Sequence, residues 1–325
     1  MAERAYLCEK GKQGIEILEC CGFDSLVVIP EEIEGLAVIA LAPYLFSVHE
    51  NHNDRQHLDT FWWSFAGKRI SQQEAEELPK VKGNSLKELS FPSSLKQIGA
   101  YGFYNCEELK RLELYSTTLD WGAGVFAGCV GIEELVIHVD ESQKSCLKEI
   151  LAELRQTLRV IYKGKEQANL VFPEFFEEAV ENTPARILVT NTHGCGQKYR
   201  NAFVQTQFQF KEYDSLFPHI QVQESEELVM ELVLGRVMYP YQLAEEHKRH
   251  YMQYLKEHWT EAACYIVKKE DIQSLRWLTE NLSYDNSDLK MAIEAANRKG
   301  NVSAVSLLMN LSGSQEKAGR RRFVL

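Results

Sequence analysis

The sequence lacks the features of a membrane-spanning, exported or nucleic-acid-binding protein. No run approaches the about 18 apolar residues of a membrane span. The first ten residues contain no apolar stretch of the kind that a secretory signal needs. The chain has 36 Lys and Arg against 47 Asp and Glu, a formal net charge of −11. We therefore expect a cytoplasmic protein that neither spans a membrane nor binds nucleic acid.

The acidic surplus belongs to both halves of the chain. Residues 1–165 have 18 basic and 25 acidic side chains, and residues 166–325 have 18 and 22. Neither half has the basic surplus of a phosphate-binding protein. The one basic cluster, residues 320–322, has only three arginines, which is too few to indicate nucleic-acid binding.

The sequence also lacks the cysteine pairs that mark many metal sites. Its eight cysteines are scattered, apart from the neighbours Cys20 and Cys21, and no C-x-x-C pair occurs. Adjacent cysteines rarely bridge each other, so we expect reduced thiols. We predict neither a cofactor nor a metal ion.

The chain does contain enough apolar material for more than one domain. It has 325 residues, of which 45% are hydrophobic and 26% charged. At about 150 residues per domain, this length predicts two domains.

An apolar pattern recurs at a constant offset in the first half. The stretch 86–91 (LKELSF) returns at 109–114 (LKRLEL) and again at 132–137 (IEELVI), which is a period of 23. Three further residue types follow the same offset, as Gly99 and Gly122, Phe103 and Phe126, and Cys106 and Cys129. Such a period is the sequence signature of a repeat protein.

Each repeat predicts one coil of a solenoid. The L-x-x-L-x-L stretch is a short strand whose alternate side chains point inward. Gly99 and Gly122 are expected at turns that need a positive φ. Phe103 and Phe126 are expected to stack in a ladder between coils, with the recurring cysteines turned inward as reduced thiols.

An earlier coil is predicted at 27–33, where Ile29-Pro30 matches Phe91-Pro92 and Phe46 takes the part of Phe103. Residues 86–106 nearly fit L-x-x-I-x-L-P-x-x-L-x-x-I-G-x-x-A-F-x-x-C. Residues 15–163 therefore resemble bacterial leucine-rich repeat proteins of the surface-antigen (BspA-like) type. The resemblance implies a leucine-rich repeat solenoid that binds varied partners. It also implies a cell-surface adhesin as an alternative, if a leader was removed from the chain.

An insert at 47–84 interrupts the repeat. It contains an aromatic cluster, Phe61, Trp62, Trp63 and Phe65, and a helix start in which Ser71 and Glu74 have capping-box spacing. The aromatic cluster is either a recognition patch or the packing of the insert onto the solenoid. The insert is also rich in histidine, at positions 49, 52 and 57 with Asp54 and Asp59, but this spacing matches no strong zinc pattern.

The repeat ends in a helix at 142–156 followed by a strand at 158–162, which together would cap the solenoid. Residues 1–165 are thus predicted as the solenoid domain. The fold class expected for the whole chain is α+β, with an α-helical domain at 166–325.

The second half predicts helices, among them 174–182 and 241–258, with the start of another at 186–190. A second repeat, of period 30, covers about 260–311 as two helix pairs. Asp271 and Asn301 are expected as N-caps and Gly300 as a C-cap. This segment resembles ankyrin-type helix pairs, although the T-P-L-H signature is missing. A flexible C-terminal tail is expected beyond it.

The segment 192–200 (THGCGQKYR) offers the clearest candidate for small-molecule chemistry. Its glycines suggest a turn whose amides bind an anion or ligand together with His193, Lys198, Tyr199 and Arg200. The pattern lacks the remaining residues of a dinucleotide fingerprint or P-loop, so a plain turn is the competing interpretation. Cys195 and His193 alone do not predict cysteine catalysis.

The function predicted from these features is a non-enzymatic protein–protein interaction or scaffold module with no catalytic residues. The expected partner-binding residues are the aromatic cluster of the insert and outward-facing residues of the repeated strands, namely Glu88, Arg111, Glu113, Glu133 and Glu134. The alternative is an enzyme or ligand sensor with a site between the two domains near 193–200.

Overall fold

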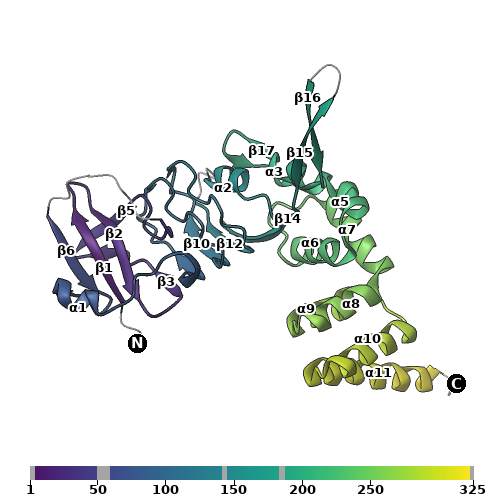
Figure 1. The fold of residues 1–325 in the computed structure, drawn as a ribbon. Helices are drawn as coiled ribbons and strands as arrows, with labels where there is room; N and C mark the ends of the chain where they lie inside the picture. Colours follow the sequence, from purple (N-terminus) through teal and green to yellow (C-terminus); the bar gives the residue numbers. More distant parts are fainter. Residues whose placement is uncertain (1–3, 50–58, 141–144, 183–186, 323–325) are drawn as a thin grey trace. The chain divides into compact units, whose positions relative to one another are not determined.

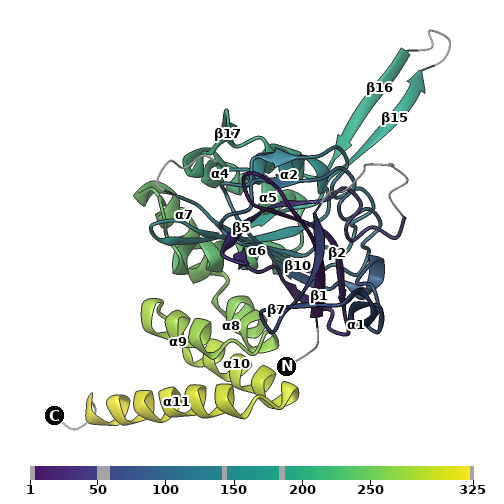
Figure 2. The same ribbon diagram turned by 90° about the vertical axis from the view of Figure 1, so that its left-hand side faces the viewer.

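The computed structural model describes residues 4–49, 59–140, 145–182 and 187–322. The chain divides into two compact units, residues 1–216 and 217–325. The first unit contains all the described strands and the second is helical, so the fold is mixed α/β (Figures 1 and 2). The first unit extends past residue 165, where the sequence predicted the change to helices.

A six-stranded sheet forms the repeated part of the first unit. Its order is β14-β13-β12-β10-β8-β3, with β3 to β13 parallel and β14 antiparallel. Glu88, Arg111 and Glu134 face one another in register, so the predicted repeat spacing is the spacing of neighbouring strands. The strands are β3 (Leu26–Val28), β8 (Glu88–Ser90), β10 (Arg111–Tyr115), β12 (Glu134–His138), β13 (Leu158–Lys163) and β14 (Gln167–Phe172).

An eight-stranded sheet contains the other strands of the coils and the N-terminal strands. Its order is β11-β9-β5-β2-β1-β6-β7, and β4 pairs with β5 off this path. The strands are β1 (Arg4–Lys10), β2 (Ile15–Gly22), β4 (Glu32–Ile33), β5 (Leu36–Leu41), β6 (Thr60–Ser64), β7 (Lys68–Ile70), β9 (Gln97–Ile98) and β11 (Asp120–Trp121).

The predicted aromatic ladder is confirmed between the two sheets. The Phe103 ring lies 5.5 Å from Phe46 and 5.6 Å from Phe126, nearly parallel to both. The Sγ atoms of Cys106 and Cys129 donate to the carbonyls of Phe46 and Phe103, at 3.2 and 2.9 Å. Each thiol thus binds the backbone of the preceding coil, and burial raises the pKa of Cys129 to about 12.

The prediction that the repeated glycines have a positive φ is wrong. Gly99 and Gly122 do not have positive φ; they lie where one coil's backbone touches the next. A Cβ on Gly122 would stand 2.3 Å from the Ala100 nitrogen, closer than any real contact. The left-handed positions come later in the coil, at Tyr101 and Asn105 and, one repeat later, at two other glycines, Gly124 and Gly128.

Short helices complete the first unit. The capping box of Ser71 and Glu74 starts α1 as predicted, and α2 forms within the predicted range 142–156, of which residues 142–144 lie outside the described residues. The helices are α1 (Gln72–Glu76), the 3-10 turn η1 (Gly83–Ser85), α2 (Leu147–Glu153), α3 (Gly196–Arg200) and α4 (Phe210–Ser215). A small hairpin, β17 (Phe203–Val204) and β18 (Gln207–Phe208), precedes α4.

The helices predicted at 174–182 and from 186 are wrong. Residues Phe176–Asn182 form β15, which pairs antiparallel with β16 (Ile187–His193) in a hairpin that stands away from the sheets of this unit (Figures 1 and 2). β16 reads ILVTNTH, rich in β-branched residues that favour strands. Pairing with this strand overrides the helical preference of Glu and Ala in β15.

The second unit is a series of helices, and the helical period predicted from residue 224 is confirmed. They are α5 (Phe217–Gln223), α6 (Glu226–Met238), α7 (Glu245–Glu257), α8 (Trp259–Lys268), α9 (Ile272–Asn281), α10 (Asn286–Lys299) and α11 (Val302–Arg322). α8 packs against α10, with Ala262 and Ala292 fully buried. α11 continues to Arg322, so the flexible tail expected beyond 311 is helical as far as that residue.

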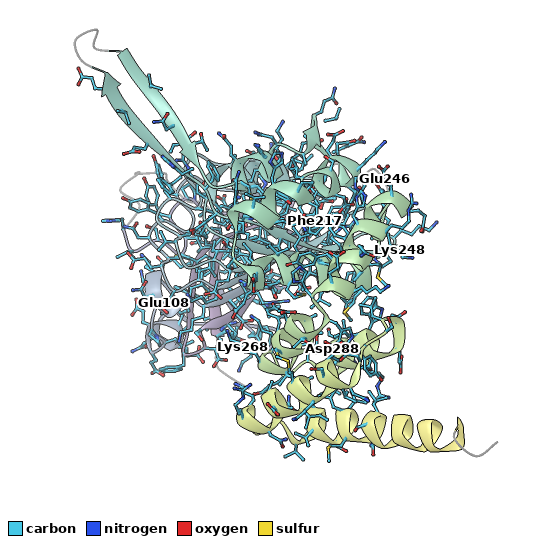
Figure 3. The ribbon with its side chains drawn as sticks, turned by 90° about the vertical axis from the view of Figure 1, so that its right-hand side faces the viewer. Glu108, Phe217, Glu246, Lys248, Lys268 and Asp288 are labelled. Atoms are coloured by element: carbon cyan, nitrogen blue, oxygen red, sulfur yellow. The ribbon has the colours of Figure 1, made fainter. Side chains whose placement is uncertain are left out.

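The predicted caps of the helix pairs are confirmed. Asp271 accepts a hydrogen bond from the Ser274 amide at 3.0 Å, and the Asn301 side chain accepts one from Ala304 at 3.0 Å. Gly300 ends α10 with φ +73°. Within the same unit, Thr260 donates to Asp288 at 2.7 Å and Lys268 pairs with Glu227. Lys268 and Asp288 are labelled on the helices of this unit in Figure 3. Among the described residues, no helix combines the length and apolarity of a membrane span.

Candidate functional site

One face of the six-stranded sheet carries most of the side chains that the sequence placed outward. Alternate residues of its strands, such as Val27, Leu89, Leu112 and Leu135, are buried in the interior. The opposite alternation forms the surface that we name the outer face. It consists of Leu26, Val28, Glu88, Ser90, Arg111, Glu113, Tyr115, Glu134, His138, Arg159, Ile161 and Lys163. Val136 has the same alternation but is fully buried.

Parallel pairing aligns the outer face in rows across the strands. The first row runs from Leu26 through Glu88, Arg111 and Glu134 to Arg159, so that its charges alternate in sign. The row forms because each coil contributes one residue to it at nearly the same place in its repeat, and the signs alternate because Glu and Arg take turns at that place. Opposite charges on neighbouring strands attract across the ladder.

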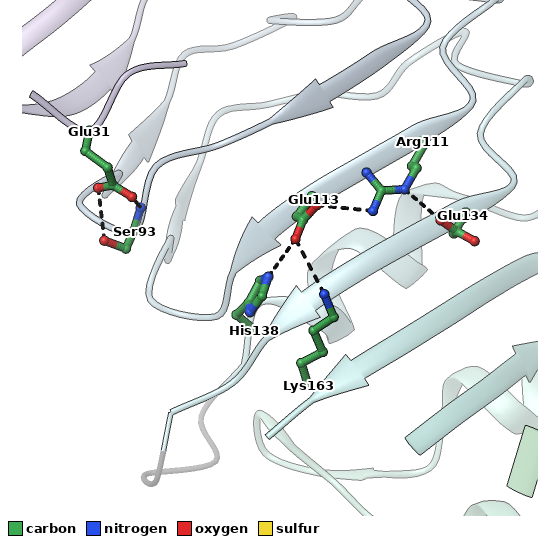
Figure 4. Close-up of polar contacts among 7 residues, drawn as sticks. All are labelled: Glu31, Ser93, Arg111, Glu113, Glu134, His138 and Lys163. Carbon is green, nitrogen blue, oxygen red and sulfur yellow. Dashed lines mark hydrogen bonds and ion pairs between the residues drawn. The ribbon is translucent and has the colours of Figure 1, made fainter. Parts of the chain in front are cut away.

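A network of ion pairs joins the middle of the outer face (Figure 4). Arg111 contacts Glu134 at 2.7 Å through Nε and Glu113 at 3.1 Å through Nη2. The other oxygen of Glu113 lies 2.8 Å from His138 Nε2 and 3.7 Å from Lys163 Nζ. Three neighbouring strands are thereby connected through the two side chains Arg111 and Glu113.

Partial burial and hydrogen bonds together shift the pKa values of Glu113 and Arg111 in this network. Burial by itself would raise the pKa of the Glu113 carboxyl, but hydrogen bonds from His138 and Arg111 outweigh it and hold that pKa below its usual range. For Arg111, burial opposes the charge while the hydrogen bonds to Glu134 and Glu113 raise its pKa. The Arg111 and Glu113 pair is therefore charged at neutral pH and fixed in position.

The outer face ends in apolar side chains on β3. Leu26 and Val28 are 52% and 51% exposed, and Phe23, just before the strand, is 70% exposed. The outer edge of β3 is covered, because Arg4 donates to the carbonyls of Asp24 and Leu26 and Tyr6 donates to that of Val28. β3 therefore presents side chains, whereas its outward carbonyls are occupied.

The opposite edge of the sheet is covered in the same way. The Tyr213 hydroxyl accepts from the Val171 amide at 2.8 Å and donates to the Val171 carbonyl at 2.7 Å. Rings of Tyr162, Phe172, Phe208 and Tyr213 pack together at this edge. Strand addition at either covered position would first have to displace a tyrosine.

Sequence reasoning named part of the outer face. Glu88, Arg111, Glu113 and Glu134 lie on it, while Glu133 lies beside it and pairs with Lys110 at 3.2 Å. It missed His138, Arg159 and Lys163, which the repeat period could have located, and Leu26 and Val28, which look like core residues in the sequence.

The aromatic cluster of the insert does not form one surface. Phe61 is buried with Arg69 stacked 4.1 Å from its ring centre, and Phe65 is 48% exposed. Trp62 and Trp63 are half-buried neighbours on β6, whose side chains point to opposite faces of the sheet. Trp62 packs on a small core of Ala5, Cys21 and Ala75.

The segment 192–200 spreads its candidate residues apart. His193 is exposed beside Glu178, and Lys198 is exposed on α3, whereas Tyr199 is buried. The buried Arg200 guanidinium donates to the carbonyls of Leu154, Pro173, Gly196 and Gln156. Burial lowers the pKa of Arg200 to about 10, which still leaves it charged at neutral pH.

These contacts give Arg200 a structural use, because it ties α3 to the backbone that follows α2 and β14. Gly196 fits here for a similar reason, since a Cβ would stand 2.0 Å from the Pro173 oxygen. The described residues of the histidine-rich insert show no grouping that could hold a metal ion, and His52, Asp54 and His57 lie outside the described residues.

Comparisons with known proteins bear on the repeated part. Residues 81–156 match the family whose description reads "BspA type Leucine rich repeat region (6 copies)". The stretch that supplies β8, β10 and β12 is thus a leucine-rich repeat region, as the sequence pattern indicated. A search of curated proteins found no match.

One solved structure is similar, that of a leucine-rich repeat protein from T. pallidum. It is 22% identical, with a TM-score of 0.29, and the match covers 49% of this chain. The matched part spans 61% of that protein's chain.

Proposed function

We propose that this chain is a non-enzymatic protein-interaction module that binds a protein partner through the outer face. The observation that carries the proposal is the combination on one sheet face of an exposed apolar end, Leu26 and Val28, with a fixed network of charges around Arg111 and Glu113. Protein interfaces combine an apolar centre with a polar rim in this way. Leucine-rich repeats also suggest such a role, because stacked coils provide an extended surface.

The charges of the outer face favour a partner with a mixed-charge surface. The row that alternates in sign disfavours both a strongly basic and a strongly acidic partner, since each would meet like charges. Because Glu113 and Arg111 are already held by neighbours, they lose little side-chain entropy when a partner binds.

The finer architecture belongs to the same proposal. We take the parallel strands, one repeat apart, as a short solenoid, and the helix pairs α8–α9 and α10–α11, which follow the second period, as ankyrin-like stacking. Both kinds of repeat are binding scaffolds.

The same proposal includes a non-enzymatic role and a cytoplasmic location. Arg200, the cation of the segment that suggested ligand chemistry, is engaged with carbonyls, and the thiol of Cys195 is buried. The eight cysteines, all described and all outside disulfide bonds, suit a reducing compartment. Fractionation of native cells tests the location, and recovery in the membrane or medium fraction would contradict it.

Affinity capture from native cells tests the proposed function. The bait is the full chain as wild type, as the double variant Leu26→Asp/Val28→Asp, and as the matched control Leu119→Asp/Val130→Asp. The control residues are 60% and 71% exposed in the same unit but lie outside the outer face. A partner captured by the wild type and the control and lost by the first variant supports the proposal.

A purified partner then allows the charged network to be tested. Arg111→Glu should weaken binding about tenfold or more, because it places a third carboxylate beside those of Glu113 and Glu134, and the like charges repel one another. Equal capture by all three baits, or no specific capture by the wild type, would contradict the proposed function.

A further inference from the structure

A second surface lies on the eight-stranded sheet and is independent of the outer face. Four strands align Glu19, Leu7, Trp62 and Ile70 in one straight row, with Leu7 paired to both Glu19 and Trp62 and Trp62 paired to Ile70. The row places an aromatic ring and two aliphatic side chains beside one carboxylate. It forms the floor of a depression.

The helix α1 makes one wall of this depression. Ala75 packs on Ala5 and Cys21, which form the next row of the same sheet face. Because α1 has only five residues, it covers that row and leaves the row of Trp62 open. The pocket that results has a volume of about 700 Å³ and is lined by Leu7, Glu19, Cys21, Thr60, Phe61, Trp62, Arg69, Ile70, Gln72, Ala75, Glu76, Leu78 and Lys80.

The lining is balanced in charge. Lys80 pairs with Glu19 at 2.9 Å, and Gln72 donates to Glu76 at 2.7 Å. Arg69 forms a bidentate ion pair with Glu34. Two carboxylates and two cations in the lining give no surplus of either sign. An anionic or a cationic ligand therefore gains no net electrostatic attraction here.

The lining nevertheless offers many hydrogen-bonding groups around an apolar floor. Thr60, Gln72 and Glu76 line the rim as exposed residues, and their side chains offer both hydrogen-bond donors and acceptors. A purely apolar ligand would remove water from these groups without replacing its hydrogen bonds. The ligand that suits both parts is neutral, has one apolar face, and carries both donors and acceptors on its edge.

We propose that this pocket binds a sugar ring. A pyranose has an apolar C–H face that packs on an indole, and equatorial hydroxyls that both donate and accept. The volume lies within the usual range for small-molecule sites, about 300–1,000 Å³. Trp62 would be the platform for the ring, and Gln72, Glu76 and Thr60 would bind the hydroxyls.

Ligand-observed NMR on the full chain, followed by calorimetry, tests the proposal with a panel of neutral mono- and disaccharides, with inorganic phosphate and a lysine-rich peptide as charged probes. We expect at least one sugar to bind with a Kd in the millimolar range or tighter, and Trp62→Ala to weaken it about tenfold or more. Trp63→Ala is the matched control, because Trp63 is the neighbouring residue on the opposite face and does not line the pocket.

A second variant guards against misfolding of Trp62→Ala. Gln72 and Glu76 are exposed on α1, so Gln72→Ala/Glu76→Ala leaves the core intact and should also weaken sugar binding about tenfold. The proposal is overturned if no neutral sugar binds, if both variants bind as tightly as the wild type, or if only inorganic phosphate or a lysine-rich peptide binds. None of these outcomes affects the proposal for the outer face.

Discussion

The coils of the first unit and the helix pairs of the second both bring successive repeats into close contact, but by different means. In the coils, backbone meets backbone, and Gly122 has no room for a Cβ beside Ala100. In the helix pairs, side chains meet, and buried Ala262 and Ala292 keep α8 and α10 close. The coils can therefore approach each other because Gly122 has no Cβ, and the helices can do so because the side chains of Ala262 and Ala292 are small.

This difference predicts unequal tolerance to mutation. A coil cannot move away from a new atom without breaking hydrogen bonds such as that from the Gly122 amide to the Ile98 carbonyl, 2.8 Å long. A helix can shift by a few tenths of an ångström because its hydrogen bonds are internal. The following predictions test this contrast by the free energy of unfolding.

The largest effect is expected at the aromatic ladder. Phe103→Ala removes a fully buried ring that stacks on both Phe46 and Phe126, and should lower the free energy of unfolding by about 4 kcal/mol. Urea denaturation followed by circular dichroism measures this. Phe23→Ala, at a 70% exposed ring, should change stability by no more than about 0.5 kcal/mol. Similar losses for the two variants would rule out the ladder as a stabilising element.

Gly122→Ala should be nearly as damaging although it adds only one methyl group. The Cβ would stand 2.3 Å from the backbone nitrogen of Ala100, and overpacking of this kind should cost about 3 kcal/mol. The same denaturation experiment measures the loss. A cost below about 1 kcal/mol would show that the coils can separate.

Gly300→Ala supplies the counterpart in the helix pairs. No atom lies within 4 Å of the added Cβ, so only the left-handed backbone, with φ +73°, opposes the change. We expect a loss of about 1 kcal/mol. If Gly300→Ala proved more costly than Gly122→Ala, crowding between the backbones of neighbouring coils would not be the main cost of a Cβ at Gly122.

The smallest effect is expected at Glu113, and it depends on pH. Its pKa is lower in the folded protein, so its contribution is present above the unfolded pKa of about 4.3 and is lost as the pH falls through the folded pKa. Glu113→Gln should reduce stability by less than about 1 kcal/mol at pH 7, because the pair is partly exposed. Below that folded pKa the variant and the wild type should approach each other. A difference that stays constant from pH 7 down through that pKa would exclude the charge as the cause.

Much of the first unit could be predicted because the sequence period copies the structural period. A residue such as Phe103 recurs wherever the coil needs a ring, so the ladder could be predicted without coordinates. The period did not explain Gly122 correctly, because a close approach between coils and a left-handed turn both select glycine. The true left-handed positions escaped notice, since two of them are Tyr101 and Asn105.

The region from 166 to 216 resisted prediction because its structure depends on pairing with distant residues. β14 is fixed by β13 and by the Tyr213 hydroxyl, 42 residues beyond Val171. β15 has helix-favouring residues and becomes a strand because β16 lies beside it. Likewise, Arg200 looked like part of an anion site, and only the fold shows its guanidinium surrounded by carbonyls.

By itself, the sequence determined the two repeat periods, the caps of the helices and the inward ladder of phenylalanine and cysteine. These features depend on local patterns in which the same residue types recur from one repeat to the next. The tertiary structure decided which outward charges meet, which apolar residues of β3 stay exposed, and which of the two neighbouring tryptophans lines a pocket. Those outcomes depend on strand register and on what covers each sheet face, and both join residues that lie far apart in the chain.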